Sequence, residues 1–323
     1  MACTACQVAL GACPLILWAF KPKPALNPLD KHVLITGGSE GLGLSLGKEW
    51  VRSGAKVTLV SRAQAKLDAA KLEVEQQVPG AQVACFAADT TNLDQLKVAV
   101  EAATSHFGPV DVLICNAGSS KPGYFIEQPV EDFERTMRVN FFGSLHAAKI
   151  VAPQMVARRS GHICLVGSAM SIIGFAGYSS YAPTKWALRG LADCLRNEFQ
   201  GTGVSVSIAY PPDMDTPGYK TETTTKPQEC LAISEGEALM SPDRVAKAIV
   251  RGVSRGDYHI PAPDFGQEAL ASKMAGMTPP PFGTVLSVLL APLLVLVALV
   301  YRVRWDRIVA RAAERRRPWV PKL

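Results

Sequence analysis

The sequence has few of the patterns that bind metals or form disulfides. Its five histidines, at positions 32, 106, 146, 162 and 259, have no ligand spacing with acids or cysteines. Its eight cysteines are scattered, and Cys85, Cys115 and Cys164 lie within apolar runs. This distribution favours buried, reduced thiols over a disulfide framework. We therefore expect no metal site, and we expect the chain to fold in a reducing compartment.

Charge is absent from two stretches, residues 1–20 and 274–301. The net charge of +6 lies in residues 302–323, which contain eight basic and two acidic residues, so the rest of the chain is balanced. A basic tail directly after a long uncharged stretch indicates a membrane surface rather than nucleic acid. We expect membrane lipids as partners and no nucleic acid.

These boundaries divide the chain into four expected parts: an N-terminal hydrophobic anchor and linker (1–28), a globular domain (29–265), a hydrophobic membrane-associated segment (266–301) and a basic amphipathic tail (302–323). The apolar run 8–20 is short for a membrane span. Lysines follow it and no base precedes it. The positive-inside rule then predicts an uncleaved anchor with the globular domain in the cytosol.

The second apolar segment, residues 282–301, could cross a bilayer as a helix of about 30 Å. A single crossing would place the arginine-rich tail in the lumen, which the positive-inside rule opposes. Pro292 bisects the segment and could interrupt a helix. We therefore predict a re-entrant hairpin that breaks at Pro292, followed by an interfacial amphipathic helix that contains Trp305 and Ile308.

Short β-rich runs alternate with helical patterns between residues 29 and 265. Because the strands are apolar throughout, they predict an α/β fold: a single domain with a doubly wound parallel sheet covered on both faces. We expect the polar run 221–225 to form a mobile loop over the site. The expected strands are 32–36, 56–60, 82–87, 111–115, 162–167, 204–209 and 258–260, and the expected helices are 41–53, 63–77, 92–106, 130–157, 179–200 and 242–254.

The first expected strand ends in a glycine-rich loop, residues 36–43, with the sequence Thr-Gly-Gly-Ser-Glu-Gly-Leu-Gly. Such glycines allow a tight turn and let the backbone approach a pyrophosphate at a helix N-terminus. An ordinary turn is the alternative, but the loop lies between an apolar strand and an amphipathic helix. It therefore predicts a dinucleotide site, and we expect the acid at 40 to point away from the phosphates. The loop residues expected at the cofactor are Gly37, Ser39, Glu40, Gly41 and Gly43.

Three further strand ends predict cofactor contacts. The second strand is followed by Arg62 and Lys66 and lacks the acid typical of NAD sites, which favours the extra phosphate of NADP. The alternative is two solvated bases. Asp89, after the third strand, is expected at the adenine edge, and Asn116, after the fourth, is expected to line the cofactor with its amide.

Tyr181 and Lys185 lie four residues apart, on one face of an expected helix. A phenol beside a positive charge loses its proton more easily, so we expect Lys185 to lower the pKa of Tyr181. The alternative is a half-buried aromatic beside a solvated lysine. Ser168 at the end of the fifth strand, with the phenol and the ammonium, suits a carbonyl oxygen. Asn140 lies between apolar residues, as if it points at a bound group or water.

With these motifs in this order, residues 30–255 resemble the short-chain dehydrogenase/reductase family. The resemblance implies a Rossmann-type sheet that binds NADPH, with Tyr181 as proton donor and Ser168 as its hydrogen-bond partner. It implies that Lys185 holds the nicotinamide ribose and that Asn140 completes a proton relay. We expect Pro211 and Thr216 to close over the nicotinamide amide. Pro183 and Thr184 depart from the family pattern, in which small residues are commoner.

The region after residue 209, with the sequence Ala-Tyr-Pro-Pro-Asp-Met-Asp-Thr-Pro-Gly, resembles a branch of this family that reduces long-chain keto-sphingoid bases. The resemblance implies ketone reduction with NADPH at the cytosolic face of the endoplasmic reticulum membrane, with residues 217–240 over the lipid chain. Two alternatives stay open: a membrane retinol or steroid dehydrogenase of the same family, and a non-catalytic dinucleotide-binding membrane scaffold. The sequence also leaves open a homo-oligomer.

Overall fold

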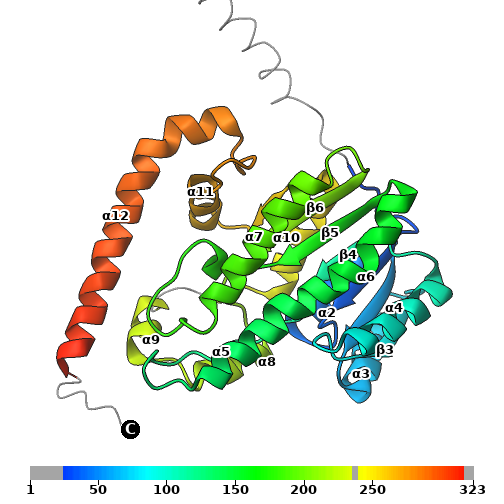
Figure 1. Cartoon of the computed structure of the whole chain (residues 1–323), viewed down its shortest axis with the longest axis horizontal. Helices are drawn as coiled ribbons and strands as arrows, with labels where there is room; N and C mark the ends of the chain where they lie inside the picture. Colours follow the sequence, from blue (N-terminus) through cyan, green and yellow to red (C-terminus); the bar gives the residue numbers. More distant parts are fainter. Residues whose placement is uncertain (1–24, 235–238, 316–323) are drawn as a thin grey trace, which may run out of the picture.

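A computed structural model describes residues 25–234 and 239–315. In this range seven parallel strands form one sheet in the order β3-β2-β1-β4-β5-β6-β7 (Figure 1). Each observed strand lies within about a residue of its expected position, which confirms the doubly wound parallel sheet. The strands are β1 (His32–Thr36), β2 (Lys56–Ser61), β3 (Val83–Ala87), β4 (Val112–Cys115), β5 (Gly161–Val166), β6 (Val204–Tyr210) and β7 (His259–Pro261).

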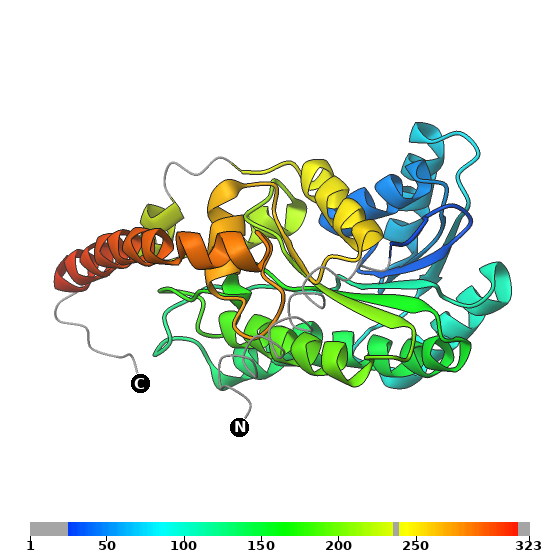
Figure 2. The same ribbon diagram turned by 90° about the horizontal axis from the view of Figure 1, so that it is seen from above.

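Helices cover both faces of the sheet, as Figure 2 shows. Because successive strand residues point to opposite faces, Val33 and Ile35 pack under α2 (Gly41–Arg52), α3 (Gln64–Gln77) and α10 (Pro242–Arg255). Leu34 packs instead under α4 (Leu93–Phe107), α6 (Gly143–Arg158) and α7 (Ala182–Glu198). The strands are therefore buried on both sides, which explains why they are apolar throughout.

The sheet reverses its strand order between β1 and β4. The chain builds β2 and β3 on one side of β1 and then resumes with β4 on the other, where Val33 pairs with Val112. The carboxyl ends of β1 and β4 are therefore neighbours, with no helix between them. In open α/β sheets ligands bind at such a switch point.

One expected helix, residues 130–157, has a local irregularity. It consists of α5 (Val130–Met137), a π-helical turn η1 (Arg138–Phe142) and α6. Single π turns inside helices are rare and occur frequently at functional sites. This one contains Asn140, which is fully buried.

The expected mobile loop at 221–225 is wrong for most of its length, because α8 (Pro217–Thr223) includes its first three residues. The helix begins at Thr216, whose Oγ1 accepts a hydrogen bond from the Tyr219 N–H at 3.1 Å. Within the helix, threonine hydroxyls donate to carbonyls one turn earlier, as Thr221 does to Pro217 at 3.1 Å. Local capping and these internal bonds satisfy the polar run without an open loop. A second short helix, α9 (Gln228–Ser234), follows.

The predicted break at Pro292 is also wrong. After α11 (Phe265–Lys273), a single helix α12 (Thr284–Arg315) runs through Pro292 without interruption. The flanking leucines are strong helix formers, and a proline is tolerated in long apolar helices. Residues 284–313 form a helix long and apolar enough to cross a membrane, with a mean hydropathy of 2.6 in its most apolar window.

Helix α12 lies alongside the domain rather than in its core (Figure 1). It contacts α9 and α11, and the Trp305 ring lies 5.4 Å from the ring of Phe175. Its Leu and Val side chains between 285 and 300 are mostly exposed. The expected N-terminal anchor lies almost entirely in residues 1–24, outside the described residues.

Candidate active site

The glycine-rich loop between β1 and α2 is packed too closely for side chains. Gly37 and Gly41 have φ angles of +67° and +55°, a region that favours glycine. A Cβ on Gly43 would lie 2.0 Å from the Gly37 carbonyl oxygen. The hydroxyl of Ser61, at the end of β2, donates to Ser39 at 2.9 Å and holds the loop from its other side. A backbone without crowding side chains, at a helix N-terminus that has no side-chain cap, fits a dinucleotide pyrophosphate.

Asn116 shapes this loop with the amide that we expected at the cofactor. Its Nδ2 donates to the carbonyl oxygens of Thr36 at 3.1 Å and Gly37 at 3.2 Å. The Thr36 hydroxyl oxygen in turn accepts from the N–H groups of Asn116 and Ala117, each at 3.1 Å. Thr36, which sequence reasoning did not single out, therefore ties the ends of β1 and β4 together. Its position as the last residue of the first strand, next to the glycine loop, is the sequence signal that could have indicated this role.

The groups expected around the adenosine lie along the ends of β2 and β3. Arg62 is exposed directly after β2. Lys66 forms an ion pair with Glu40, Nζ to Oε2, at 2.8 Å. Both side chains are about half exposed, so the pair stabilises the fold by less than about 1 kcal/mol and can exchange partners. Asp89 accepts hydrogen bonds from the Thr91 N–H and hydroxyl, each at 2.8 Å, which orients its carboxylate.

Ser168, Tyr181 and Lys185 meet at the carboxyl end of β5. Ser168 begins the short helix η2 (Ala169–Ser171), where its hydroxyl oxygen accepts a hydrogen bond from the Met170 N–H at 3.2 Å, and its side chain is close enough to Tyr181 to favour the phenolate. Lys185 is buried in the first turns of α7; its Nζ donates to the Val166 carbonyl oxygen at 2.9 Å. The same Nζ lies 5.6 Å from the centre of the Tyr181 ring. The structure thus brings together three of the four residues expected to be catalytic.

The electrostatics of Tyr181 differ from our expectation. Burial raises the pKa of the Tyr181 phenol, the charge of Glu222 raises it further, and the Ser168 side chain opposes them. The expected lowering by Lys185 is not found, because burial has the largest effect on the phenol; burial also lowers the pKa of Lys185, to about 8. Tyr181 is consequently protonated at neutral pH, as a proton donor must be.

Asn140, the fourth expected catalytic residue, links three segments of the chain through the hydrogen bonds of its side-chain amide, which we call the Asn140 clamp. Its Oδ1 accepts from the Ser119 N–H at 2.8 Å, and its Nδ2 donates to Ser119 O at 3.0 Å and to Thr184 Oγ1 at 2.9 Å. The Thr184 hydroxyl donates to the Tyr181 carbonyl oxygen at 2.7 Å. Thr184, a departure from the family pattern, therefore joins the Asn140 amide to the backbone of Tyr181.

The segment after β6 lies against both the glycine loop and the catalytic group. The Pro211 carbonyl accepts from the Ala169 N–H at 3.1 Å, directly after Ser168. The side chain of Thr216 is the nearest neighbour of the space that a Cβ on Gly41 would occupy, at 3.3 Å. Pro211 thus lies beside Ser168 and Thr216 beside Gly41, and their closure over a bound nicotinamide stays a prediction.

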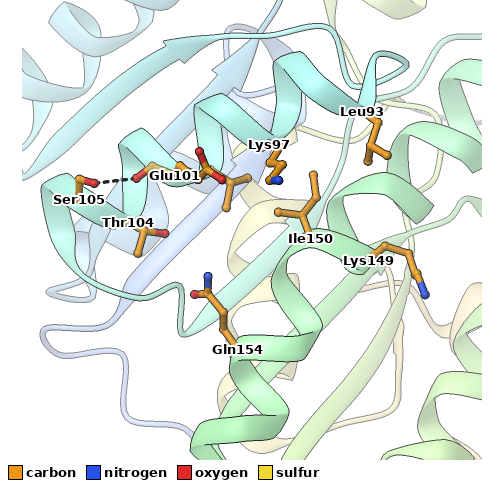
Figure 3. Close-up of a pocket in the computed structure, with 9 residues that line it drawn as sticks. Leu93, Lys97, Glu101, Thr104, Ser105, Lys149, Ile150 and Gln154 are labelled. Carbon is orange, nitrogen blue, oxygen red and sulfur yellow. Dashed lines mark hydrogen bonds between the residues drawn. The ribbon is translucent and has the colours of Figure 1, made fainter.

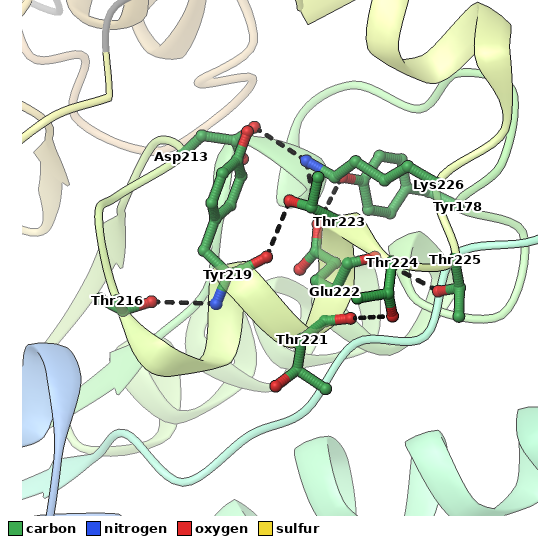
Figure 4. Close-up of polar contacts among 10 residues, drawn as sticks. All are labelled: Tyr178, Asp213, Thr216, Tyr219, Thr221, Glu222, Thr223, Thr224, Thr225 and Lys226. Atoms are coloured by element: carbon green, nitrogen blue, oxygen red, sulfur yellow. Dashed lines mark hydrogen bonds and ion pairs between the residues drawn. The ribbon is translucent and has the colours of Figure 1, made fainter.

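Sequence reasoning missed a polar cluster that surrounds Lys226 (Figure 4). Its Tyr178 ring lies 5.9 Å from the Tyr181 ring, centre to centre. The Tyr178 hydroxyl donates to Glu222 Oε1 at 2.5 Å. The Lys226 ammonium lies 3.2 Å from Asp213 Oδ2 and 3.3 Å from Glu222 Oε1, and 4.1 Å from the centre of the Tyr219 ring. We call these five residues the Glu222 cluster. Four of them follow β6, so their meeting with Tyr178 had no local signal in the sequence.

Other features of the described residues lie away from this site. A hollow of about 510 Å³ between α4 and α6 is lined by residues that include Lys97, Glu101 and Lys149, and by none of the expected site residues (Figure 3). Within residues 25–234 and 239–315 no group of three or more His, Cys, Asp or Glu side chains could hold a metal ion.

Comparisons with known proteins agree with this geometry. The sequence model of the short chain dehydrogenase family matches residues 31–227. The chain is 37% identical to a 3-ketodihydrosphingosine reductase of Dictyostelium discoideum, over 95% of this chain and 96% of that protein. It is 39% identical to a 3-ketodihydrosphingosine reductase of Bos taurus, over 80% and 78%. Among solved structures, levodione reductase superposes with a TM-score of 0.68 at 26% identity, over 74% of this chain and 98% of that one.

Proposed function

The chain belongs to the short-chain dehydrogenase family, and we propose that it reduces the 3-keto group of 3-dehydrosphinganine to sphinganine with NADPH, a step of sphingolipid biosynthesis. The meeting of Ser168, Tyr181 and Lys185 at the carboxyl end of β5 is the observation on which this rests. The relatives named 3-ketodihydrosphingosine reductase, which match most of the chain, support this substrate.

The residues of the chain bind the ketone and supply its proton. The Tyr181 hydroxyl, protonated at neutral pH, donates a hydrogen bond to the ketone oxygen and then transfers its proton there. The Ser168 hydroxyl, which contacts Tyr181, donates to the same oxygen and stabilises the charge that develops on it. Bound NADPH supplies the hydride that reaches the carbonyl carbon. Asn140 and Thr184 hold the start of α7, and with it Tyr181 and Lys185, in position.

The residues present suit NADPH. The glycine loop leaves backbone N–H groups open at the start of α2, where a pyrophosphate binds. Arg62 is exposed at the end of β2, and no acid occupies the adjacent position, Ser61. A guanidinium there can pair with a 2′-phosphate. Lys66 can join it by exchanging Glu40 for the phosphate.

The two alternatives have less support. A retinol or steroid dehydrogenase would share the catalytic group, but the relatives with the same layout across most of the chain are named for the keto-sphingoid base. A non-catalytic scaffold would be free to lose catalytic side chains. Here Ser168, Tyr181 and Lys185 are all present at the same end of β5, and Asn140 is joined through Thr184 to the Tyr181 backbone.

We infer that α12 binds the endoplasmic reticulum membrane, with the catalytic domain and the basic tail on the cytosolic side. The exposed Leu and Val side chains of residues 285–300 would otherwise face water. The contact of Trp305 with Phe175 places the helix beside the segment that leads to Tyr178 and Tyr181. A lipid substrate could then pass from the bilayer to the site without crossing water.

One experiment separates these functions. The purified chain, in phospholipid vesicles with NADPH, is given 3-dehydrosphinganine, retinal or a 3-ketosteroid, and NADPH oxidation is followed with product identification by mass spectrometry. We expect sphinganine to form at least about 100-fold more efficiently than retinol or a hydroxysteroid. Preferred reduction of retinal or the steroid would contradict the proposed substrate, and no turnover with any ketone would favour the scaffold.

A further inference from the structure

The Glu222 cluster contains the groups that bind an ammonium ion. Two carboxylates, of Asp213 and Glu222, lie within 3.3 Å of the Lys226 Nζ, and the Tyr219 ring faces it at 4.1 Å. The Lys226 side chain has no exposed surface. Carboxylates together with an aromatic face are the usual partners of a desolvated ammonium. The buried position of Lys226 therefore shows that the Glu222 cluster can bind an ammonium group.

The cluster has more negative than positive charge. Within residues 25–234 and 239–315, Asp213 and Glu222 together pair with one ammonium, that of Lys226. The Tyr178 hydroxyl and the Lys226 ammonium both contact Oε1 of the Glu222 carboxylate, and among the described residues no hydrogen bond reaches Oε2. Burial raises the pKa of Glu222, because an incompletely balanced carboxylate is disfavoured away from water. A second cation at Oε2 would relieve this cost.

The Glu222 cluster is also close enough to Tyr181 to contact a substituent on the carbon next to the reacting ketone. The Tyr178 ring, whose hydroxyl holds Glu222, lies 5.9 Å from the Tyr181 ring, centre to centre. The charge of Glu222 raises the pKa of the Tyr181 phenol, as a nearby carboxylate does. In 3-dehydrosphinganine the ammonium is bonded to the carbon adjacent to the ketone. When the ketone oxygen is at Tyr181, the ammonium nitrogen is therefore about 3 Å from that oxygen, and a hydrogen bond of about 3 Å from the ammonium then reaches a carboxylate roughly 6 Å away.

We propose, building on the function proposed above, that Glu222 is a specificity-determining residue that binds the 2-ammonium group of the keto-sphingoid base while Tyr181 binds its ketone oxygen. Tyr178 and Lys226 position the carboxylate through Oε1, and Oε2 receives the substrate. The chain thereby selects a lipid ketone that has a neighbouring positive charge.

The test compares two ketones that differ only at this amine: 3-dehydrosphinganine and its desamino analogue, 1-hydroxyoctadecan-3-one. For the full chain in phospholipid vesicles with NADPH, we expect kcat/KM to favour the amine by about 10-fold to 100-fold. In Glu222→Gln this preference should fall to less than about 3-fold, mostly through a higher KM for the amine. Glu222→Asp keeps the charge and should restore part of the preference. Any effect of the substitution on Tyr181 itself acts on both ketones and cancels in the ratio.

Glu229→Gln is the matched control, because Glu229 also accepts a hydrogen bond from a tyrosine hydroxyl, that of Tyr124, at 2.7 Å, and is buried. It should keep the wild-type preference. Equal use of the two ketones by the wild-type chain would overturn the inference without any variant, and so would an unchanged preference in Glu222→Gln. If the wild-type chain reduces neither ketone, it is the proposed function that fails.

Discussion

The Lys185 ammonium lies over the Tyr181 ring, 5.6 Å from its centre. Its Nζ donates a hydrogen bond to the Val166 carbonyl oxygen, while the phenol has the Ser168 side chain as its polar neighbour. The two residues thus share a helix face, as their spacing requires, but they have different polar neighbours. Burial makes Tyr181 lose its proton less readily and Lys185 lose its proton more readily. The two residues therefore lead to different predictions.

Removing the Tyr181 hydroxyl should abolish most turnover without loss of cofactor binding. In Tyr181→Phe we expect kcat to fall by about 10²-fold to 10⁴-fold, because only the proton donor is lost. The dissociation constant of NADPH, measured by fluorescence titration, should change less than about 3-fold. Lys185→Ala should impair both quantities. Near-normal kcat in the Phe variant would mean that another group is the acid.

Lys185 should make stability depend on pH. Its pKa is lowered from 10.5 to about 8 by burial, so between these values the unfolded chain binds a proton that the folded chain has lost, and stability rises with pH. Below pH 8 the folded chain bears the full cost of the buried charge. Lys185→Met does not bear this cost, so its free energy of unfolding should exceed that of the wild type by the largest amount below pH 8. This difference should shrink by up to about 3 kcal/mol at higher pH.

This prediction is measured by urea unfolding from pH 7 to pH 10.5 in the absence of NADPH. Lys247→Met is the control, because Lys247 is exposed on α10. The same pH dependence in both variants would show that Lys185 is not the responsible group.

The ion pair between Glu40 and Lys66 should limit the affinity for NADPH. Glu40→Gln releases Lys66 and removes a negative charge from the phosphate loop, so we expect the KM for NADPH to fall by about 2-fold to 5-fold. Arg62→Ala should raise the same KM by about 10-fold or more, because a charged partner of the 2′-phosphate is lost. Initial rates with NADH provide the comparison. Equal changes for NADH and NADPH would exclude a 2′-phosphate contact at these residues.

The exposed leucines of α12 should be responsible for membrane binding. We expect simultaneous substitution of Leu289, Leu293 and Leu296 by serine to reduce flotation with vesicles of anionic phospholipid, because three apolar side chains leave the bilayer. The control is serine at three exposed apolar positions of the domain, Leu72, Leu93 and Val130, which should float as the wild type does. Equal loss in both variants would contradict a specific role of α12.

The side of the membrane is tested separately, by an N-glycosylation acceptor added after Leu323. We expect no modification, because the tail should remain cytosolic. Glycan attachment in microsomes would show that α12 crosses the membrane and places the tail in the lumen.

The sequence by itself determined the strands, most of the helices and the glycine loop. These features depend on neighbouring residues: apolar runs make buried strands, and glycines after the first strand permit the left-handed turn at Gly37. The alternation of strand and helix then orders the sheet, and the strand ends bring Ser168 and Tyr181 together. Local rules were enough for each step.

Only the tertiary structure decided which segments, distant in the sequence, supply hydrogen-bond partners to one another. The Asn116 amide holds the glycine loop, and Asn140 is joined through Thr184 to the Tyr181 backbone, because buried amides must find hydrogen-bond partners wherever the fold provides them. Burial, not the charge of Lys185, determines the pKa of Tyr181. Glu222 reaches Tyr178 across 44 residues, and helix α12 continues through Pro292. Desolvation and long-range pairing depend on three-dimensional proximity, which residue spacing does not encode.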